Sequence, residues 1–319
     1  MYYPYLRAKQ FELKALREFS EEHPNDTKIV PILEPVKKQP NALKLAISDM
    51  RKNGMRFALI VNPTDGDFKH DSINFDTLLE DLGLYEENKT IDGWIPAFLC
   101  SKKQQLDTVL PLIEKYSMKN VMLIFRSCMD IDNQTVNTLV DNPKVGYIVN
   151  AFGTTISRRL KKRLKETNKK IIRLDDCFKS KNRNADYANN DDEFFSEEPF
   201  YYKTDENLDG FADYTTLPSE YMEGGMLPYA LAIHLSYKKN EDQIYVHHFV
   251  SDSNMTNSDI RGKFREAACK VEPFFREKEK TNAVNEIITK SEDSDGYPGL
   301  GYLKKLSISN HLELMFGII

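Results

Sequence analysis

Short apolar runs alternate along the first half of the chain with segments in which apolar residues recur at helical spacing. The runs have the length of single strands and lie at Ile29–Glu34, Phe57–Asn62, Trp94–Leu99, Val121–Arg126, Gly146–Asn150 and Lys170–Asp175. The segments between them repeat apolar residues every three to four positions, as at Ile156, Leu160 and Leu164, which is typical of an amphipathic helix. Near-continuous apolar strands separated by such helices predict a parallel sheet covered by helices.

The number of strands separates a closed barrel from an open sheet. Met1–Leu6 reads as a first strand before a helix at Phe11–Glu22, and Tyr229–Ser236 reads as an eighth after a long irregular segment. Eight parallel strands are the number of a (β/α)8 barrel. The pattern therefore predicts an α/β protein with a TIM-like barrel.

The rest of the chain is expected to decorate a single barrel domain, 1–319. Ile244–Val250 follows the eighth strand after a short polar turn, which predicts an antiparallel hairpin. Residues 253–319 are expected to form a C-terminal helical extension. The segment 177–228, rich in acids and aromatics, is too long for an ordinary connection and reads as an insertion before the eighth strand. Its second half is expected to pack as a lid, whereas 181–198 reads equally well as lid or mobile surface.

Composition narrows the class of protein. With 40% hydrophobic and 29% charged residues the chain is expected to be globular, and a net charge of −5 argues against a surface that coats nucleic acid or an anionic membrane as a whole. No apolar stretch is long enough to span a bilayer and no export signal opens the chain. The cysteines lack the spacing of a zinc site, which favours reduced thiols and a cytoplasmic protein; they are Cys100, Cys128, Cys177 and Cys269.

Polar residues end most of the predicted strands, where loops of a barrel form the ligand-binding face. In strand order they are Arg7 and Lys9, Glu34, Asn62 with Asp65, Arg126, Asn150, Asp175 with Asp176, and His234 with Ser236; the fourth strand, ending at Cys100 and Ser101, is the weak one. Each alone has a plain structural reading, because strands end where the chain returns to water. As a set they would converge on one mouth if the barrel closes.

The residue types at this mouth suggest a phosphorylated ligand. Carboxylates from Glu34, Asp175 and Asp176 could hold a divalent cation such as Mg²⁺ or Mn²⁺. The amides of Asn62 and Asn150 could help to hold the cation, and the cationic side chains of Arg7, Lys9 and Arg126 could neutralise a phosphate. The predicted ligand-binding residues are Arg7, Lys9, Asn62, Arg126, Asn150, Ser236 and His248. Glu34, Asp175 and His234 are the predicted catalytic residues. His234 is the candidate acid or base, since histidine titrates near neutrality, and its structural alternative is a hydrogen-bonded barrel histidine.

Two further features carry weaker signals. His247 and His248 are adjacent on a predicted strand and therefore point to opposite faces, so at most one serves a site, and His248 is the better candidate. Eight cationic residues lie between Arg158 and Lys170. That segment reads as a solvated helix face, or else as a contact for nucleic acid or an acidic partner. Nucleotide-binding, zincin and serine-hydrolase motifs are missing from the sequence.

Several segments resemble the phage-type Beta family proteins. They are Tyr3–Arg17, Ile29–Val36 with its PxxExP-like strand, Asp213–Tyr221, Ala232–Tyr237 and His248–Asp252. The resemblance implies an association with phages, prophages and mobile elements, a small companion protein, and a role in phage–host conflict as defence or counter-defence. No catalytic residues come with it.

Three functional hypotheses follow. The first is a phosphate-ester hydrolase such as a phosphodiesterase, metal-dependent or not, in which Glu34, Asp175, Arg7, Arg126 and His234 gather at one mouth. The second is a non-catalytic barrel that binds a partner protein or a small ligand, including a nucleotide, through the mouth and the 177–228 segment. The third is nucleic-acid binding through the basic segment 158–170.

Overall fold

The computed structural model describes residues 1–70, 75–86, 89–90, 92–100, 103–126, 133–151, 162–163, 166–205, 207–224, 227–293 and 296–319. The chain forms two compact units. The first comprises Met1–Leu13, Ser20–Asp175 and Tyr201–Asp213, and the second comprises Lys14–Phe19, Asp176–Phe200 and Tyr214–Ile319. The single domain of 1–319 expected from the sequence is thus divided, and the second unit combines parts of the 177–228 segment with the C-terminal extension.

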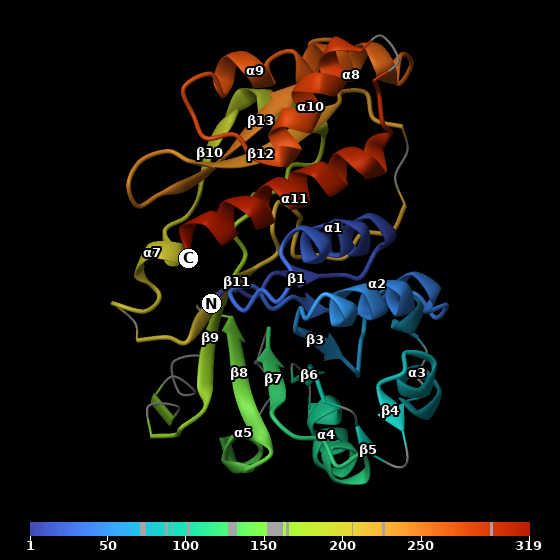
Figure 1. Cartoon of the computed structure of the whole chain (residues 1–319), viewed down its shortest axis with the longest axis vertical. Helices are drawn as coiled ribbons and strands as arrows, with labels where there is room; N and C mark the ends of the chain where they lie inside the picture. Colours follow the sequence, from blue (N-terminus) through green and yellow to red (C-terminus); the bar gives the residue numbers. More distant parts are fainter. Residues whose placement is uncertain are drawn as a thin grey trace. The chain divides into compact units, whose positions relative to one another are not determined.

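The first unit is built on eight parallel strands. In sheet order they are β1 (Tyr5–Leu6), β2 (Ile32–Leu33), β3 (Phe57–Ile60), β6 (Trp94–Leu99), β7 (Val121–Phe125), β8 (Val145–Ala151), β9 (Lys170–Asp175) and β11 (Gly210–Asp213). β7, β8 and β9 run side by side in Figure 1. Tyr2 bridges to Ile29 on one side and Phe211 on the other, which joins the first strand to the last. The eight-stranded barrel predicted from the alternation is confirmed.

Helices and a small hairpin connect the barrel strands. They are α1 (Gln10–Glu22), α2 (Asn41–Lys52), the 3-10 turn η1 (Gly66–Phe68), α3 (Phe75–Asp81), β4 (Tyr85–Glu86), β5 (Lys89–Thr90), α4 (Lys103–Lys115) and α5 (Asn133–Asp141). In α2 the buried residues are Leu43, Ala46, Ile47 and Met50, a spacing that places them on one helix face. The apolar face of a helix such as α2 is therefore buried, as the helical periodicity of the sequence predicts.

The eighth barrel strand is not the predicted one. β11 takes that place, pairing with β9 in parallel from Gly210↔Ile172 to Asp213↔Asp175. The predicted strand, Tyr229–Ser236, overlaps β12 (Ala232–Lys238), which belongs to a three-stranded antiparallel sheet in the second unit. β11 was missed because four residues, Gly-Phe-Ala-Asp, give no apolar run, and their burial comes from the neighbouring strands.

The second unit is an antiparallel sheet covered by helices. β13 (Ile244–Val250) lies between β12 and β10 (Asp192–Ser196), so the predicted hairpin is confirmed. Its helical elements are η2 (Asn184–Asn189), α7 (Glu198–Tyr201), α8 (Ile260–Ala268), α9 (Val271–Phe274), α10 (Asn282–Glu292) and α11 (Leu300–Ile318). None of the helices in the described part of the chain is both long and apolar enough to cross a membrane.

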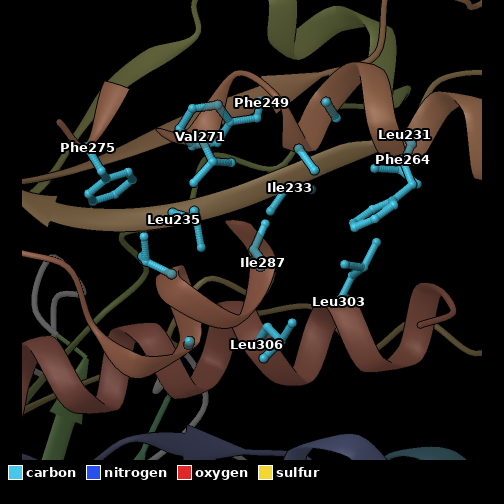
Figure 2. Packing of buried hydrophobic residues seen from close by; sticks show 14 of the residues in the cluster. Leu231, Ile233, Leu235, Phe249, Phe264, Val271, Phe275, Ile287, Leu303 and Leu306 are labelled. Carbon is cyan, nitrogen blue, oxygen red and sulfur yellow. The ribbon is translucent and has the colours of Figure 1, made fainter. Parts of the chain in front are cut away.

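An apolar cluster packs the sheet of this unit against its helices. Figure 2 shows Ile233 and Leu235 of β12 facing Ile287 of α10 and Leu303 and Leu306 of α11. These side chains are nearly inaccessible to solvent, so their contacts contribute hydrophobic stabilisation to the unit. His234 and Ser236 alternate with Ile233 and Leu235 along β12 and therefore lie on the opposite side of that strand.

Candidate functional site in the barrel mouth

Strand register determines which polar side chains enter the barrel. Paired residues of neighbouring parallel strands point to the same side of a sheet, and successive residues alternate. Arg126 reaches Glu34 although β3 and β6 separate their strands in the sheet, so both side chains cross the interior. Ile124 lies two positions before Arg126, so its side chain also faces inward. Ile124 pairs with Val149 of β8, and Val149 pairs with Ile172 of β9, so Val149 and Ile172 face inward as well.

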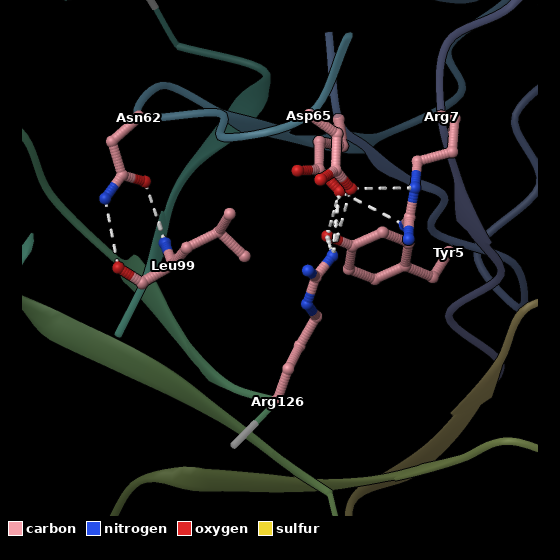
Figure 3. Close-up of polar contacts among 7 residues, drawn as sticks. Tyr5, Arg7, Asn62, Asp65, Leu99 and Arg126 are labelled. Atoms are coloured by element: carbon pink, nitrogen blue, oxygen red, sulfur yellow. Dashed lines mark hydrogen bonds and ion pairs between the residues drawn. The ribbon is translucent and has the colours of Figure 1, made fainter. Parts of the chain in front are cut away.

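Figure 3 shows the side chains of Tyr5, Arg7 and Arg126 pointing toward one another. Glu34 is the centre of these inward-facing polar residues. Its Oε2 accepts a hydrogen bond of 2.5 Å from the Tyr5 hydroxyl and one of 3.1 Å from Arg126 Nη1. Arg7 Nη1 lies 3.1 Å from the same oxygen. The Glu34 side chain is inaccessible to solvent, with 0% exposed, and a carboxylate this deeply buried requires such cationic partners.

Asp65 completes a group of two cations and two anions. Arg7 Nε lies 3.4 Å from Asp65 Oδ2, and Arg126 Nη1 lies 3.8 Å from it. The Tyr5 ring is flanked by both guanidinium groups, whose Cζ atoms lie 5.0 Å and 5.8 Å from its centroid. We call Tyr5, Arg7, Glu34, Asp65 and Arg126 the mouth cluster.

Local backbone geometry positions Asp65. Gly66 follows it with φ +62° and packs so closely on Val36 that a Cβ atom would lie 2.2 Å from the Val36 carbonyl oxygen. Glycine is the residue that tolerates both constraints. Asp67 N donates to the same carbonyl, and Asp67 accepts from Lys38 N. The loop after β3 is thereby fixed to the loop after β2, which brings Asp65 beside the two arginines.

Solvent reaches only part of the mouth cluster. The side chains of Asp65 and Arg126 are 23% and 24% exposed, whereas Arg7 is 7% exposed. Glu34 Oε1 is buried and receives no hydrogen bond from the described part of the chain. The mouth cluster therefore offers a ligand one partly exposed cation, Arg126, one partly exposed carboxylate, Asp65, and one buried acceptor, Glu34 Oε1.

Two other predicted residues lie near this end of the barrel with structural roles. Asn62 donates from Nδ2 to the Leu99 carbonyl and accepts from the Leu99 amide, at 3.0 and 2.8 Å, so it clamps the ends of β3 and β6 together. Lys9 is partly buried in the turn that starts α1, where its carbonyl accepts from Leu13 N. The side-chain amide of Asn62 is therefore used to bind the backbone of Leu99.

Asn150 and Asp175 do not point into the barrel mouth, where the sequence predicted them. Val149 and Ile172 face inward, so Asn150 and Asp175, on the alternate positions, point away from the barrel interior. Asp175 accepts a 2.6 Å hydrogen bond from Arg173 on the same outer face. Asn150 is 1% exposed. β8 is apolar on both faces, so its sequence does not show this alternation. In β9 the signal was available, because Arg173 and Asp175 alternate with the buried Ile172 and Leu174.

The predicted metal ligands are not brought together. Glu34 faces inward among cations, Asp175 faces outward, and Asp176 belongs to the second unit, where it accepts from Ser219. The described residues contain no group of three or more His, Cys, Asp or Glu side chains able to hold a metal ion. The donor set expected for Mg²⁺ or Mn²⁺ does not form there.

His234, Ser236 and His248 lie in the second unit and not on a barrel strand, because β12 and β13 form the hairpin. His234 and His248 are directly opposite in the register, with their Nδ1 atoms 2.8 Å apart. Ser236 binds α11: its carbonyl accepts from Asn310 Nδ2 at 2.9 Å, and its hydroxyl lies 2.9 Å from His311 Nδ1. The structure thus gives Ser236 a role in anchoring a helix.

The histidine pair, His234 and His248, is held neutral. Burial lowers the pKa of His248 to about 4, although Glu193 beside it acts in the opposite direction. Burial, then His248 and Lys304, lower the pKa of His234 well below its usual value. Neutral rings can share one Nδ1–H···Nδ1 hydrogen bond, whereas two imidazolium ions would repel each other.

His247 lies on the other face of β13. It stacks on Phe274 with ring centroids 4.0 Å apart, against the apolar cluster of the unit. The expected separation of His247 from His248 is seen in this geometry. Residues 158–161 and 164–165 of the basic segment 158–170 lie outside the described residues. Within the described part, Arg163 pairs with Asp141 and Glu166.

Tyr5 is the member of the mouth cluster that sequence analysis missed. It precedes Arg7 by two positions, so an extended backbone places both side chains on one face. That alternation was the available signal. The apolar run Met1–Leu6 concealed it, because a tyrosine in a strand reads as core.

Comparison with known proteins supplies limited context. No family model matches this sequence, and no curated protein matches it. Among solved structures, the crystal structure of N-acetylneuraminate lyase from Fusobacterium nucleatum complexed with pyruvate matches 98% of this chain and 96% of that chain, at 10% sequence identity and a TM-score of 0.43. The barrel described above rests on the strand order and closure of this chain.

Proposed function

We propose that the mouth of the barrel binds a small phosphorylated molecule through Arg126. The observation that supports this most is the arrangement around Glu34, in which one guanidinium is buried and a second, on Arg126, is partly open to solvent. A guanidinium offers several N–H donors in one plane, so Arg126 can keep its bond to Glu34 and still donate to a phosphate.

The remaining members of the mouth cluster would orient such a ligand. Glu34 Oε1 is a buried acceptor with no donor among the described residues, so a ligand hydroxyl could supply one. The partly exposed Asp65 carboxylate could accept a second hydroxyl. A phosphorylated polyol or sugar carries both hydroxyl donors and an anionic group, which matches this combination.

Binding is better supported than hydrolysis. Hydrolysis of a phosphate ester needs an acid and a base placed at the reacting group or a metal-bound water. Of the three predicted catalytic residues, Glu34 lies in the mouth cluster, Asp175 faces away from the interior, and His234 belongs to the second unit. We therefore propose a ligand-binding barrel and treat turnover of the ligand as an outcome to be measured.

Thermal-shift titration with ribose 5-phosphate, inorganic phosphate and ribose tests this proposal. We expect ribose 5-phosphate to raise the melting temperature of the wild type and ribose to have no effect. Arg126→Gln is expected to weaken ribose 5-phosphate binding by about tenfold or more, because a charge-assisted hydrogen bond contributes roughly 1.5–3 kcal/mol. Phosphate release in the same samples reports hydrolysis.

Arg56→Gln is the matched control. Arg56 donates to the Tyr147 hydroxyl at 3.0 Å and precedes β3, so it lies at the opposite end of the barrel strands. Its loss is expected to leave the ribose 5-phosphate shift unchanged. An equal shift in wild type and Arg126→Gln, or no shift with any phosphorylated compound, would contradict the proposal.

The biological setting is a separate part of the proposal. A role in phage–host conflict, with a small companion protein, is supported by the sequence resemblance alone. Phage plating on cells that express wild type or Arg126→Gln tests it: a change in plating efficiency that depends on Arg126 supports the role. Equal plating on both strains and on the empty host would count against it.

A further inference from the structure

The second unit contains a cavity that the barrel-mouth proposal does not use. Its volume is about 780 Å³, and every residue that lines it belongs to the second unit. Cavities that bind small organic molecules measure roughly 300–1,000 Å³. This one lies beside the histidine pair, since His234 is among its lining residues.

Exposed apolar side chains form one wall of the cavity. Met222, Leu227 and Tyr229 are 63%, 56% and 57% exposed, and Leu300 at the start of α11 is 37% exposed. These are four of the seven large apolar side chains that the described part of the chain exposes. Scattered apolar residues on a surface are ordinary, but their concentration around one cavity indicates a place where apolar surface becomes covered.

Cationic side chains surround the same space. Lys304 is exposed and forms no ion pair with another described residue, and Arg183 is 80% exposed in a surface pair with Asp186. Such an exposed pair contributes little stability, so Arg183 can exchange its partner for a ligand. Lys181 is less available because it pairs with Glu193 at 2.7 Å. The cavity therefore combines an apolar wall with two accessible positive charges.

His234 adds a directional hydrogen-bond group. His248 Nε2 faces the Glu193 carboxylate at 3.5 Å, which favours a proton on that nitrogen. His248 Nδ1 is then the acceptor for His234 Nδ1–H, and His234 Nε2 keeps a lone pair. The ring is partly exposed and lines the cavity, so this lone pair can accept from an N–H or O–H of a ligand.

We propose that this cavity binds a small amphipathic organic anion, with an apolar or aromatic body, one N–H or O–H donor for His234 Nε2, and a carboxylate, phosphate or sulfonate near Lys304. The chemistry follows from the lining: apolar walls cover the body, the neutral histidine orients it, and the cations select its charge. The cavity shares no lining residue with the mouth cluster, and it takes a ligand with a larger apolar part.

Two fluorescent probes that differ by one charge test the proposal. 8-Anilinonaphthalene-1-sulfonate carries an aromatic body, an N–H and a sulfonate, and N-phenyl-1-naphthylamine is the same molecule without the sulfonate. We expect both to bind the wild type saturably. Lys304→Gln should weaken the sulfonate probe about threefold to tenfold and leave the neutral probe unchanged. Leu227→Asp should weaken both, since it places a charge in the apolar wall.

Lys280→Gln and Met255→Ser are the matched controls, because Lys280 is exposed and Met255 is 85% exposed, and neither lines the cavity. Competition by decanoate and by decyl phosphate then shows which anion is preferred. Equal sulfonate-probe affinities in Lys304→Gln and Lys280→Gln would overturn the proposal. So would an absence of saturable binding, or equal losses of both probes in Met255→Ser and Leu227→Asp.

Discussion

The mouth cluster and the histidine pair both enclose ionisable groups, but they avoid buried net charge in opposite ways. In the mouth cluster, each guanidinium and each carboxylate has a partner of opposite sign within 4 Å. In the histidine pair, both rings lose their charge, and one neutral hydrogen bond joins them. The first arrangement is therefore sensitive to removal of a charge, and the second to addition of a proton.

Removing the central carboxylate should have the largest effect. Glu34→Gln leaves Arg7 and Arg126 with Asp65 as the one carboxylate of the cluster, so we expect a loss of about 3–5 kcal/mol in the free energy of unfolding. Trp94 in β6 is the single tryptophan of the chain, and its fluorescence during urea unfolding reports on the first unit.

Glu114→Gln is the control for this prediction. Glu114 pairs with Lys144 at 2.6 Å but is 64% exposed, so its loss should change the stability by less than about 1 kcal/mol. If Glu34→Gln and Glu114→Gln cost the same, the buried pairing of the mouth cluster would not be a stabilising feature.

Acid should destabilise the second unit through the histidine pair. The folded-state pKa of His248 is lowered to about 4 from the ordinary 6.5, and that of His234 is lowered as well. The unfolded chain therefore binds more protons between those values. Stability is complete above about pH 6.5 and falls as the pH drops toward 4, by up to about 1.4 kcal/mol per pH unit for each histidine.

Urea unfolding between pH 7 and pH 4.5, followed by circular dichroism, measures this slope. His248→Gln should make the slope shallower, because one of the two buried rings is lost. His70→Gln, which changes an exposed histidine of the first unit, should leave it unchanged. An unchanged slope in His248→Gln would show that other groups are responsible; His247, whose pKa burial also lowers, is the first to examine.

Ser236→Ala should have the smallest of the effects expected in these regions. The substitution removes the hydroxyl that lies 2.9 Å from His311 Nδ1 and 3.2 Å from Asn310 Nδ2, but it keeps the carbonyl that also binds Asn310. We expect a loss of about 1–2 kcal/mol, with faster hydrogen exchange in α11. A change above about 3 kcal/mol, or unaltered exchange in α11, would contradict the anchoring role.

The periodicity of the sequence was enough to predict the barrel, because strand and helix periods differ and eight strands close. It was not enough to find β11, where Gly210–Asp213 has too little apolar character to stand out. The hairpin was predictable from its short turn. Its register could have been predicted too, since a turn at 239–243 places His234 opposite His248.

The candidate site was predictable only in part. Arg7, Glu34 and Arg126 were found because polar residues at strand ends converge in a closed barrel. Asn150 and Asp175 satisfied the same rule but face outward. β8 is buried on both sides and does not show which face is which, whereas in β9 the alternation of Ile172 and Leu174 with polar residues was a signal that the rule did not use. The pairing of Glu34 with two arginines depends on contacts between strands that are not neighbours, which no local pattern reports.

A crystal structure of the protein grown with ribose 5-phosphate would test the central claim most directly. The account predicts the phosphate within hydrogen-bonding distance of the Arg126 guanidinium, with a ribose hydroxyl donating to Glu34 or Asp65. Phosphate bound elsewhere, with no ligand atom within hydrogen-bonding distance of the Arg126 guanidinium, would contradict it.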